Sequence, residues 1–289
     1  MKTRIITGSI FALIMAGFLL PGYKFPALPL LLFFLVNIFG GREVYRVVSA
    51  KFNLSLRGLS LLWSVIFLTA LIPCGGNTLI DRSLAQLGIF AICALTLLFF
   101  STIILACIHG TSALTPAVAV NSAGLYTAFP CAVAVVLLTA VPDGFYWLLI
   151  AVFSPWVSDV SAYFTGFYLG KRKLIPQISP KKTVAGFIGG LVGTMIVMAV
   201  AYKFMVAALY GSGSDSPYYT IIIGSFIGAI LSIASQFGDW LASVIKRETG
   251  VKDFGTLLPG HGGIMDRFDS VMFTLPATLL IVLLLAAIK

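Results

Sequence analysis

The sequence is poor in charged residues. Only 10% of its 289 residues are Asp, Glu, Lys or Arg, whereas a soluble domain has roughly a quarter. It has two histidines and four cysteines, and the cysteines show no CxxC spacing, so neither a zinc site nor a disulfide framework is indicated. Hydrophobic residues make up 59% of the chain, and the mean hydropathy is +1.04. An ordinary soluble domain is therefore excluded.

Long apolar runs fill most of the chain. Runs of about 17–25 apolar residues can cross a bilayer as helices, which satisfy their own backbone groups in hydrocarbon. The sequence predicts an all-α, polytopic integral membrane protein with one membrane domain over 1–289. The first run resembles a signal peptide but lacks an A-x-A-like cleavage site, so we expect a retained helix. The nine predicted spans are 5–21, 25–40, 58–73, 85–107, 116–141, 145–169, 184–210, 218–244 and 268–288.

Basic residues are distributed unevenly between the predicted loops. If the N-terminus is cytosolic, 15 of the 19 Lys and Arg residues fall on the cytosolic side. The positive-inside rule then predicts a multi-pass protein of the cell membrane with the N-terminus inside and the C-terminus outside. These 15 residues are Lys2, Arg4, Arg42, Arg46, Lys51, Arg57, Lys171, Arg172, Lys173, Lys181, Lys182, Lys246, Arg247, Lys252 and Arg267.

Two carboxylates, Asp159 and Asp239, lie inside predicted spans. An ionisable residue within a span is costly, and it normally faces a cavity or a partner. Asp239 belongs to a polar stripe at helical spacing, whose serines are also suited to hydrogen bonds between helices. The stripe consists of Ser232, Ser235, Gln236, Asp239, Ser243 and Lys246.

A dense polar loop, "VKDFGTLLPGHGGIMDRFDS", precedes the last apolar run. Asp266 and Asp269 are three residues apart, so they share a helix face and repel each other unless a cation lies between them. Oxygen ligands without a His or Cys cluster favour Mg²⁺, although one Asp could instead cap the helix. The glycines of "PGHGG" would let backbone N–H groups approach a phosphate, and nearby lysines and arginines would pair with it.

Two segments carry a resemblance to a known family. "SVIKRETGVKDFGTLLPGHGGIMDRFD", 243–269, closely resembles the signature of the phosphatidate cytidylyltransferases, and "DVSAYFTGFYLGKRKLIPQISPKKTVAG", 159–186, is similar to a second family segment. The resemblance implies transfer of a cytidylyl group from CTP to phosphatidic acid, giving CDP-diacylglycerol and pyrophosphate for phospholipid synthesis. Ala185 and Ala242 stand where the family often has Glu, which leaves any role of those positions open.

The residues and the resemblance together define a candidate site at the membrane surface. We expect Asp159, Asp239, Asp266 and Asp269 to be catalytic, and the last three to converge on Mg²⁺; a second, monovalent cation is left open. The expected substrate-binding residues are Ser179, Lys181, Lys182, Thr183, Ser243, Lys246, Arg247, Lys252, Asp253, His261, Gly262, Gly263 and Arg267.

Two other functions stay open at this stage. A CTP-dependent lipid or polyprenol kinase would share basic loops and an intramembrane acid, and an ion-coupled transporter would use intramembrane carboxylates. We place the catalytic helices in 116–289 and leave the role of the helices in 1–115 undefined. The expected partners are CTP, phosphatidic acid and the bilayer, without nucleic acid, and the sequence leaves a homodimer open.

Overall fold

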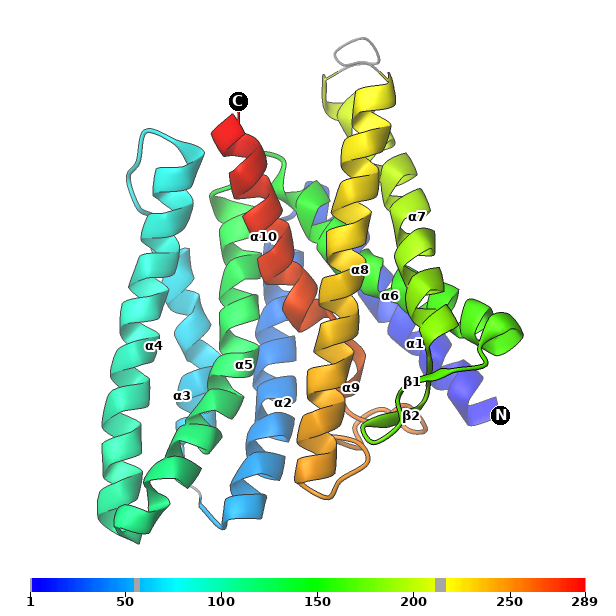
Figure 1. Ribbon diagram of the computed structural model, residues 1–289. Coiled ribbons are helices and arrows are strands. Elements are labelled where there is room, and N and C mark those ends of the chain that lie inside the picture. Colours follow the sequence, from blue (N-terminus) through cyan, green and yellow to red (C-terminus); the bar gives the residue numbers. More distant parts are fainter. Residues whose placement is uncertain (1, 55–57, 211–216, 289) are drawn as a thin grey trace.

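The computed structural model describes residues 2–54, 58–210 and 217–288, so Arg57 of the charge pattern lies outside the described residues (Figure 1). The chain forms an all-helical bundle with a single small hairpin. The α-helices are α1 (Lys2–Leu19), α2 (Ala27–Phe52), α3 (Leu59–Ile66), α4 (Leu79–His109), α5 (Leu114–Thr139), α6 (Gly144–Leu169), α7 (Val184–Tyr210), α8 (Pro217–Glu248), α9 (Met265–Phe268) and α10 (Val271–Ile288). Short 3-10 helices are η1 (Leu20–Tyr23), η2 (Phe67–Leu71) and η3 (Thr111–Ala113), and the antiparallel strands are β1 (Lys173–Ile175) and β2 (Ser179–Thr183).

Eight helices in the described residues are long and apolar enough to cross a membrane. The protein is therefore a polytopic membrane protein, as predicted. The expected third span differs, because its apolar helix covers only Leu59–Leu71 before Pro73 and two glycines end the run. The second span was predicted to end at residue 40, whereas α2 continues to Phe52 because no helix-breaking proline interrupts it.

The predicted fifth span forms despite its polar start. Pro116 lies in the first turn of α5, where a missing N–H costs nothing. Asn121 is fully buried and accepts hydrogen bonds from the Trp63 indole N–H (3.0 Å) and the Ser101 hydroxyl (2.8 Å). Its amide also donates to the Thr102 hydroxyl (3.1 Å). The hydrogen-bonded side chain of Asn121 thus joins α3, α4 and α5 in the N-terminal half.

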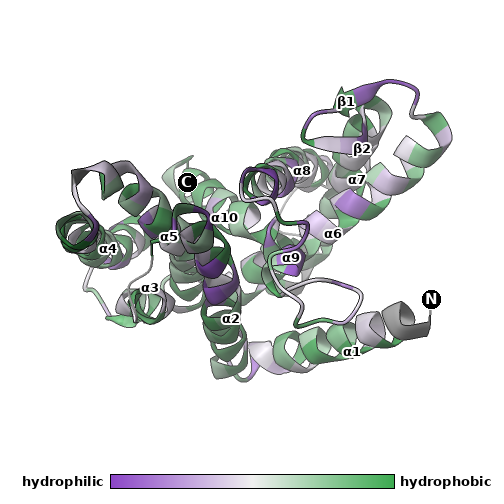
Figure 2. Ribbon diagram, turned by 90° about the horizontal axis from the view of Figure 1, so that it is seen from below, coloured by the Kyte–Doolittle hydropathy of each residue, from purple (hydrophilic) through white to green (hydrophobic). Residues whose placement is uncertain are grey.

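The polar segments gather at one end of the bundle. In Figure 1 the N-terminus, the β1–β2 hairpin and the segment 249–264 lie at the lower end, and the C-terminus lies at the upper end. Figure 2, seen from below, shows hydrophilic residues in the hairpin, around α9 and in part of α2. We call this the loop-bearing end. It brings the two basic loops onto one side, as the charge pattern predicted.

Small residues let α6, α7 and α8 approach closely. A Cβ atom added at Gly228 of α8 would lie 2.8 Å from the Cα of Met195 in α7. Between α6 and α8, the hydroxyls of Ser158 and Ser232 are 2.9 Å apart, and Gln236 donates to the Ser232 hydroxyl (3.3 Å). Ser232 and Gln236 of the predicted stripe therefore serve helix packing, which depends on such contacts in lipid.

Candidate active site

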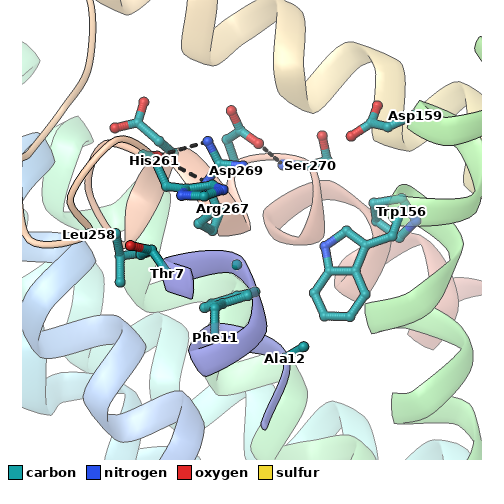
Figure 3. Close-up of a pocket in the computed structure, with 13 residues that line it drawn as sticks. Thr7, Phe11, Ala12, Trp156, Asp159, Leu258, His261, Arg267, Asp269 and Ser270 are labelled. Carbon is teal, nitrogen blue, oxygen red and sulfur yellow. Dashed lines mark hydrogen bonds between the residues drawn. The ribbon is translucent and has the colours of Figure 1, made fainter. Parts of the chain in front are cut away.

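A first cavity, of about 310 Å³, lies at the loop-bearing end between α1, α6, the segment 249–264, α9 and the two residues after α9. Asp159 and Trp156 of α6 face Asp269, Arg267 and His261 across it, as Figure 3 shows, while Thr7 and Phe11 of α1 form another wall. Asp266 and Asp269 both line this cavity. The cavity thus combines carboxylates with a guanidinium and an imidazole.

A second cavity, of about 470 Å³, lies on the other side of α6, beneath the hairpin. Three lysines line it, namely Lys173, Lys181 and Lys182, together with Thr183 and Gln236. Asp159 lines both cavities and is solvent-exposed in the protein. Two cation-lined spaces therefore meet at one carboxylate.

The end of the hairpin is joined to the first turn of α7 by a side-chain hydrogen bond. The Thr183 hydroxyl accepts a hydrogen bond from the Gly186 N–H (3.1 Å) and so caps the helix. This cap gives Thr183, which we predicted to bind substrate, a structural partner inside the chain. The preceding residue, Lys182, forms an ion pair with Asp239 of α8 and lies 5.6 Å from the centre of the Trp240 ring. Asp239, which has no cation three or four residues away in its own helix, obtains one from the hairpin.

Asp266 uses its two oxygens differently. Oδ2 accepts hydrogen bonds from the backbone N–H groups of Phe254 and Gly263, both at 2.9 Å. Oδ1 accepts one from the Lys246 ammonium at 3.0 Å, and the Asp266 side chain is only 4% exposed. One oxygen therefore holds the loop in shape, and the other holds a cation.

Glu43 of α2 holds the same loop from the opposite side. Its Oε1 accepts a hydrogen bond from the Ile264 N–H (3.2 Å) and its Oε2 accepts one from the Met265 N–H (2.9 Å). Gly255 and Gly263 pack directly on this carboxylate, where an added Cβ would clash. Sequence reasoning missed Glu43, since it placed residues 41–57 in a loop. The available signal was one acidic residue at the end of a long apolar run.

The glycines of "PGHGG" therefore have a second explanation. Gly262 has φ +86°, a conformation that favours glycine, and an added Cβ would lie 2.8 Å from Asp266 Oδ2. Gly262 and Gly263 are thus required for close approach to the Asp266 and Glu43 carboxylates, whereas we had expected these glycines to let backbone N–H groups bind phosphate. Arg267 is fixed nearby, since its Nε and Nη2 donate to the His261 carbonyl at 3.1 and 2.8 Å.

Asp159, Asp239 and Asp269 form what we call the acidic cluster. Asp159 belongs to α6 and Asp239 to α8, and Asp269 lies between α9 and α10. The three carboxylates interact electrostatically with one another. Lys182, Lys246 and Arg267 supply opposing charge. No three His, Cys, Asp or Glu side chains in the described residues are arranged to hold a metal ion. Lys182 pairs with Asp239 and Lys246 pairs with Asp266, and the expected convergence of Asp239, Asp266 and Asp269 on Mg²⁺ stays a prediction.

Eight of the 13 predicted substrate-binding residues lie outside the lining of the two cavities, and they are Ser179, Ser243, Lys246, Arg247, Lys252, Asp253, Gly262 and Gly263. Ser179 in β2 and Ser243 in α8 are half-buried. Arg247, Lys252 and Asp253 are exposed on the loop-bearing end. The other predicted residues that line the cavities are Asp159, Lys181, Lys182, Thr183, His261, Asp266, Arg267 and Asp269.

Comparison with known proteins agrees with this site. A model described as "Cytidylyltransferase family" matches residues 2–285. The chain belongs to the cytidylyltransferase family. The match covers nearly the whole chain, including α1 and α2, which contribute Thr7 and Glu43 to the site.

Individual relatives match a shorter region. Phosphatidate cytidylyltransferase of Staphylococcus haemolyticus is 46% identical over 134 residues, which is 46% of this chain and 48% of the relative. The protein of the same name from Bacillus subtilis is 45% identical over 133 residues, or 46% of each chain. The alignments thus span about half the length of these curated relatives.

Proposed function

We propose that this member of the cytidylyltransferase family transfers the cytidylyl group of CTP to phosphatidic acid, releasing pyrophosphate and forming CDP-diacylglycerol. The observation that carries this proposal is the meeting of two cation-lined cavities at Asp159, beside the acidic cluster. A reaction between two polyanions needs such an arrangement, since each must be bound and their mutual repulsion overcome. The names of the curated relatives support the same activity.

The reaction requires little proton transfer by the protein. An oxygen of the lipid phosphate attacks the α-phosphorus of CTP, and the bond from that phosphorus to the bridging oxygen of pyrophosphate breaks. The attacking phosphate is already ionised near neutral pH, so no strong general base is required. Lys182, Lys246 and Arg267 would bind phosphate oxygens, and Asp159 would orient the reacting groups between the cavities.

Magnesium fits this site by the chemistry of its donors. Asp239, Asp269 and the Oδ1 of Asp266 offer the oxygen ligands that a hard divalent ion prefers. A bound Mg²⁺ would stabilise negative charge on the α-phosphate and the departing pyrophosphate. For the carboxylates to bind it, Lys182 and Lys246 must exchange Asp239 and Asp266 for phosphate oxygens. A second, monovalent cation and a homodimer stay predictions.

A labelling assay tests the proposed function. Purified protein in detergent receives phosphatidic acid, Mg²⁺ and CTP carrying ³²P at either the α- or the γ-phosphate. Cytidylyl transfer puts only the α-label into the lipid, whereas a kinase puts only the γ-label there. A protein that moves ions across proteoliposomes and labels no lipid would be a transporter, which would refute the proposal.

The site requires access to cytosolic CTP, so we propose that the loop-bearing end faces the cytosol of the bacterial plasma membrane. The test is a Lys173→Cys variant in a background without the four native cysteines. Lys173 is exposed in β1, so its replacement can be reached by a reagent from the side on which it lies. A membrane-impermeant maleimide should label this cysteine only after the cells are permeabilised. Labelling in intact cells would show that the loop-bearing end faces the outside of the cell and would refute this orientation.

A further inference from the structure

A third cavity, of about 630 Å³, lies between α4, α5 and α10. We call it the lipid-facing groove. On α4 its wall is a helical stripe formed by Leu87, Ala91, Ala94 and Leu98, in which the two alanines make room. Phe129 of α5 and Phe273 of α10 close the other sides. All three helices are long and apolar enough to cross a membrane, so the medium around the groove is hydrocarbon.

Tyr126 adds a side chain with a polar group to the lining of the groove. This residue lines the groove, and its hydroxyl is buried without a hydrogen-bond partner in the part of the chain that the structure describes. A buried hydroxyl without a partner is costly, so its presence points to a polar group supplied by a ligand. Acyl chains of the bulk bilayer offer no such group.

Two residues that line the groove, Tyr126 and Phe273, lie next to the acidic cluster. Tyr126 interacts electrostatically with Asp269 and Asp239. Phe273, which lines the groove, lies one helical turn after Asp269 and packs beside Gly238, the neighbour of Asp239. A molecule in the groove can therefore place an apolar chain between α4, α5 and α10 while its polar end reaches the carboxylates.

We propose that the lipid-facing groove binds an acyl chain of the phosphatidic acid substrate and that the Tyr126 hydroxyl donates a hydrogen bond to an oxygen at its glycerol-phosphate end. This inference rests on the proposed function and adds to it the binding site of the lipid chain. It also gives α4 a role that the sequence left undefined. Substrate would enter sideways from the bilayer, and CTP would enter from the loop-bearing end.

Kinetics with two chain lengths provide the first test. Ala91→Trp fills the groove, and Ile92→Trp is its control, since Ile92 is 68% exposed on the same helix and lies outside the groove lining. Ala91→Trp should raise the KM for dioleoyl phosphatidic acid by at least about tenfold, as expected when about two methylene groups are excluded. It should leave the KM for the dihexanoyl lipid unchanged, and Ile92→Trp should change neither. Equal effects on both lipids, or none, would refute the groove assignment.

The Tyr126 hydroxyl is tested separately. Tyr126→Phe keeps the ring that lines the groove and removes only the donor. It should lower kcat/KM for both lipids by about 3- to 10-fold, the usual cost of one lost hydrogen bond. Unchanged kinetics would remove Tyr126 from the proposal.

Crosslinking provides a readout that is independent of turnover. A phosphatidic acid with a diazirine in its acyl chain should label peptides of α4, α5 or α10 in the wild-type protein and in the Ile92→Trp variant, but not in Ala91→Trp. Unlabelled phosphatidic acid should compete, and phosphatidylcholine should not. Equal competition by phosphatidylcholine would assign the groove to bulk lipid and refute the inference even in an active enzyme. Selective labelling without lipid cytidylylation would instead preserve the groove and refute the proposed function.

Discussion

Glu43 and Asp239 are carboxylates of two membrane-spanning helices, and their partners differ. Both oxygens of Glu43 accept hydrogen bonds from backbone N–H groups, those of Ile264 and Met265. Asp239 has a lysine as its partner and two other carboxylates within electrostatic range. The Glu43 carboxylate is thus fully used in holding the loop, whereas that of Asp239 can exchange its partner.

The proposed function makes Asp239 a reactive carboxylate, and this difference distinguishes it from a structural carboxylate such as Glu43. Backbone donors are fixed by the fold, so they hold a carboxylate permanently. A lysine side chain is flexible and can turn to a phosphate when a substrate arrives. Asp266 combines both behaviours, with one oxygen on backbone N–H groups and one on Lys246. The predictions below test this contrast.

The largest effect is expected for Asp239→Asn. The change keeps the size of the side chain but removes a charge from the acidic cluster, so the fold should persist while kcat falls about 100- to 1000-fold. The Mg²⁺ concentration needed for half-maximal rate should rise. Both quantities are measured with purified protein over a Mg²⁺ titration.

Glu248→Gln is the matched control for Asp239→Asn. Glu248 ends the same helix, is exposed and pairs with Lys51, another lysine from a distant segment. Loss of a surface ion pair costs little, so kcat should stay within about twofold of wild type. Near-normal turnover of Asp239→Asn at low Mg²⁺ would place Asp239 with Glu43 among the structural carboxylates.

The second prediction concerns the cations opposite the acidic cluster. Lys182→Ala combined with Arg267→Ala removes two charges that line the cavities, and kcat/KM should fall about 10- to 100-fold through weaker phosphate binding. Lys24→Ala combined with Lys203→Ala removes two basic residues that the charge pattern places on the opposite side, and it should leave the kinetics unchanged. Wild-type kinetics in the first pair would mean that these charges set only topology.

The sequence singled out Asp159 and Asp239 more readily than Glu43. Asp159 and Asp239 stand out because each is a lone acid in an apolar helix, a local feature. Glu43 is 221 residues away in the sequence from Ile264, whose N–H it binds. No local sequence pattern indicates a contact between residues so far apart in the chain. The pairing of Lys182 with Asp239 was equally unpredictable, because it depends on the hairpin folding under α8. The helices were predictable from hydrophobic run length, except where α2 continues to Phe52 and where the third predicted span ends early at Leu71.

The third prediction tests Glu43 itself. Glu43→Gln keeps one carbonyl acceptor and leaves one of the two backbone N–H groups without a partner, so the protein should lose about 1–3 kcal/mol of stability. The Tm should fall, measured by thermal unfolding in detergent, and kcat/KM should fall less than in Asp239→Asn. A variant with an unchanged Tm and a kcat reduced as far as that of Asp239→Asn would make Glu43 a reactive group.

The smallest effect is expected about two turns before Asp239, at Ser232. Its hydroxyl lies 2.9 Å from that of Ser158 and accepts from Gln236, so Ser232→Ala removes contacts between packed helices without changing charge. Hydrogen bonds between membrane helices contribute about 0.6 kcal/mol on average, because the alternatives in the bilayer also find partners. The Tm should therefore drop slightly, and kcat and the Mg²⁺ requirement should match wild type. Because Ser232 and Asp239 lie on the same polar stripe of α8, a loss of turnover in Ser232→Ala comparable to that of Asp239→Asn would mean that the stripe acts as one unit, and the separation between structural and reactive groups would fail.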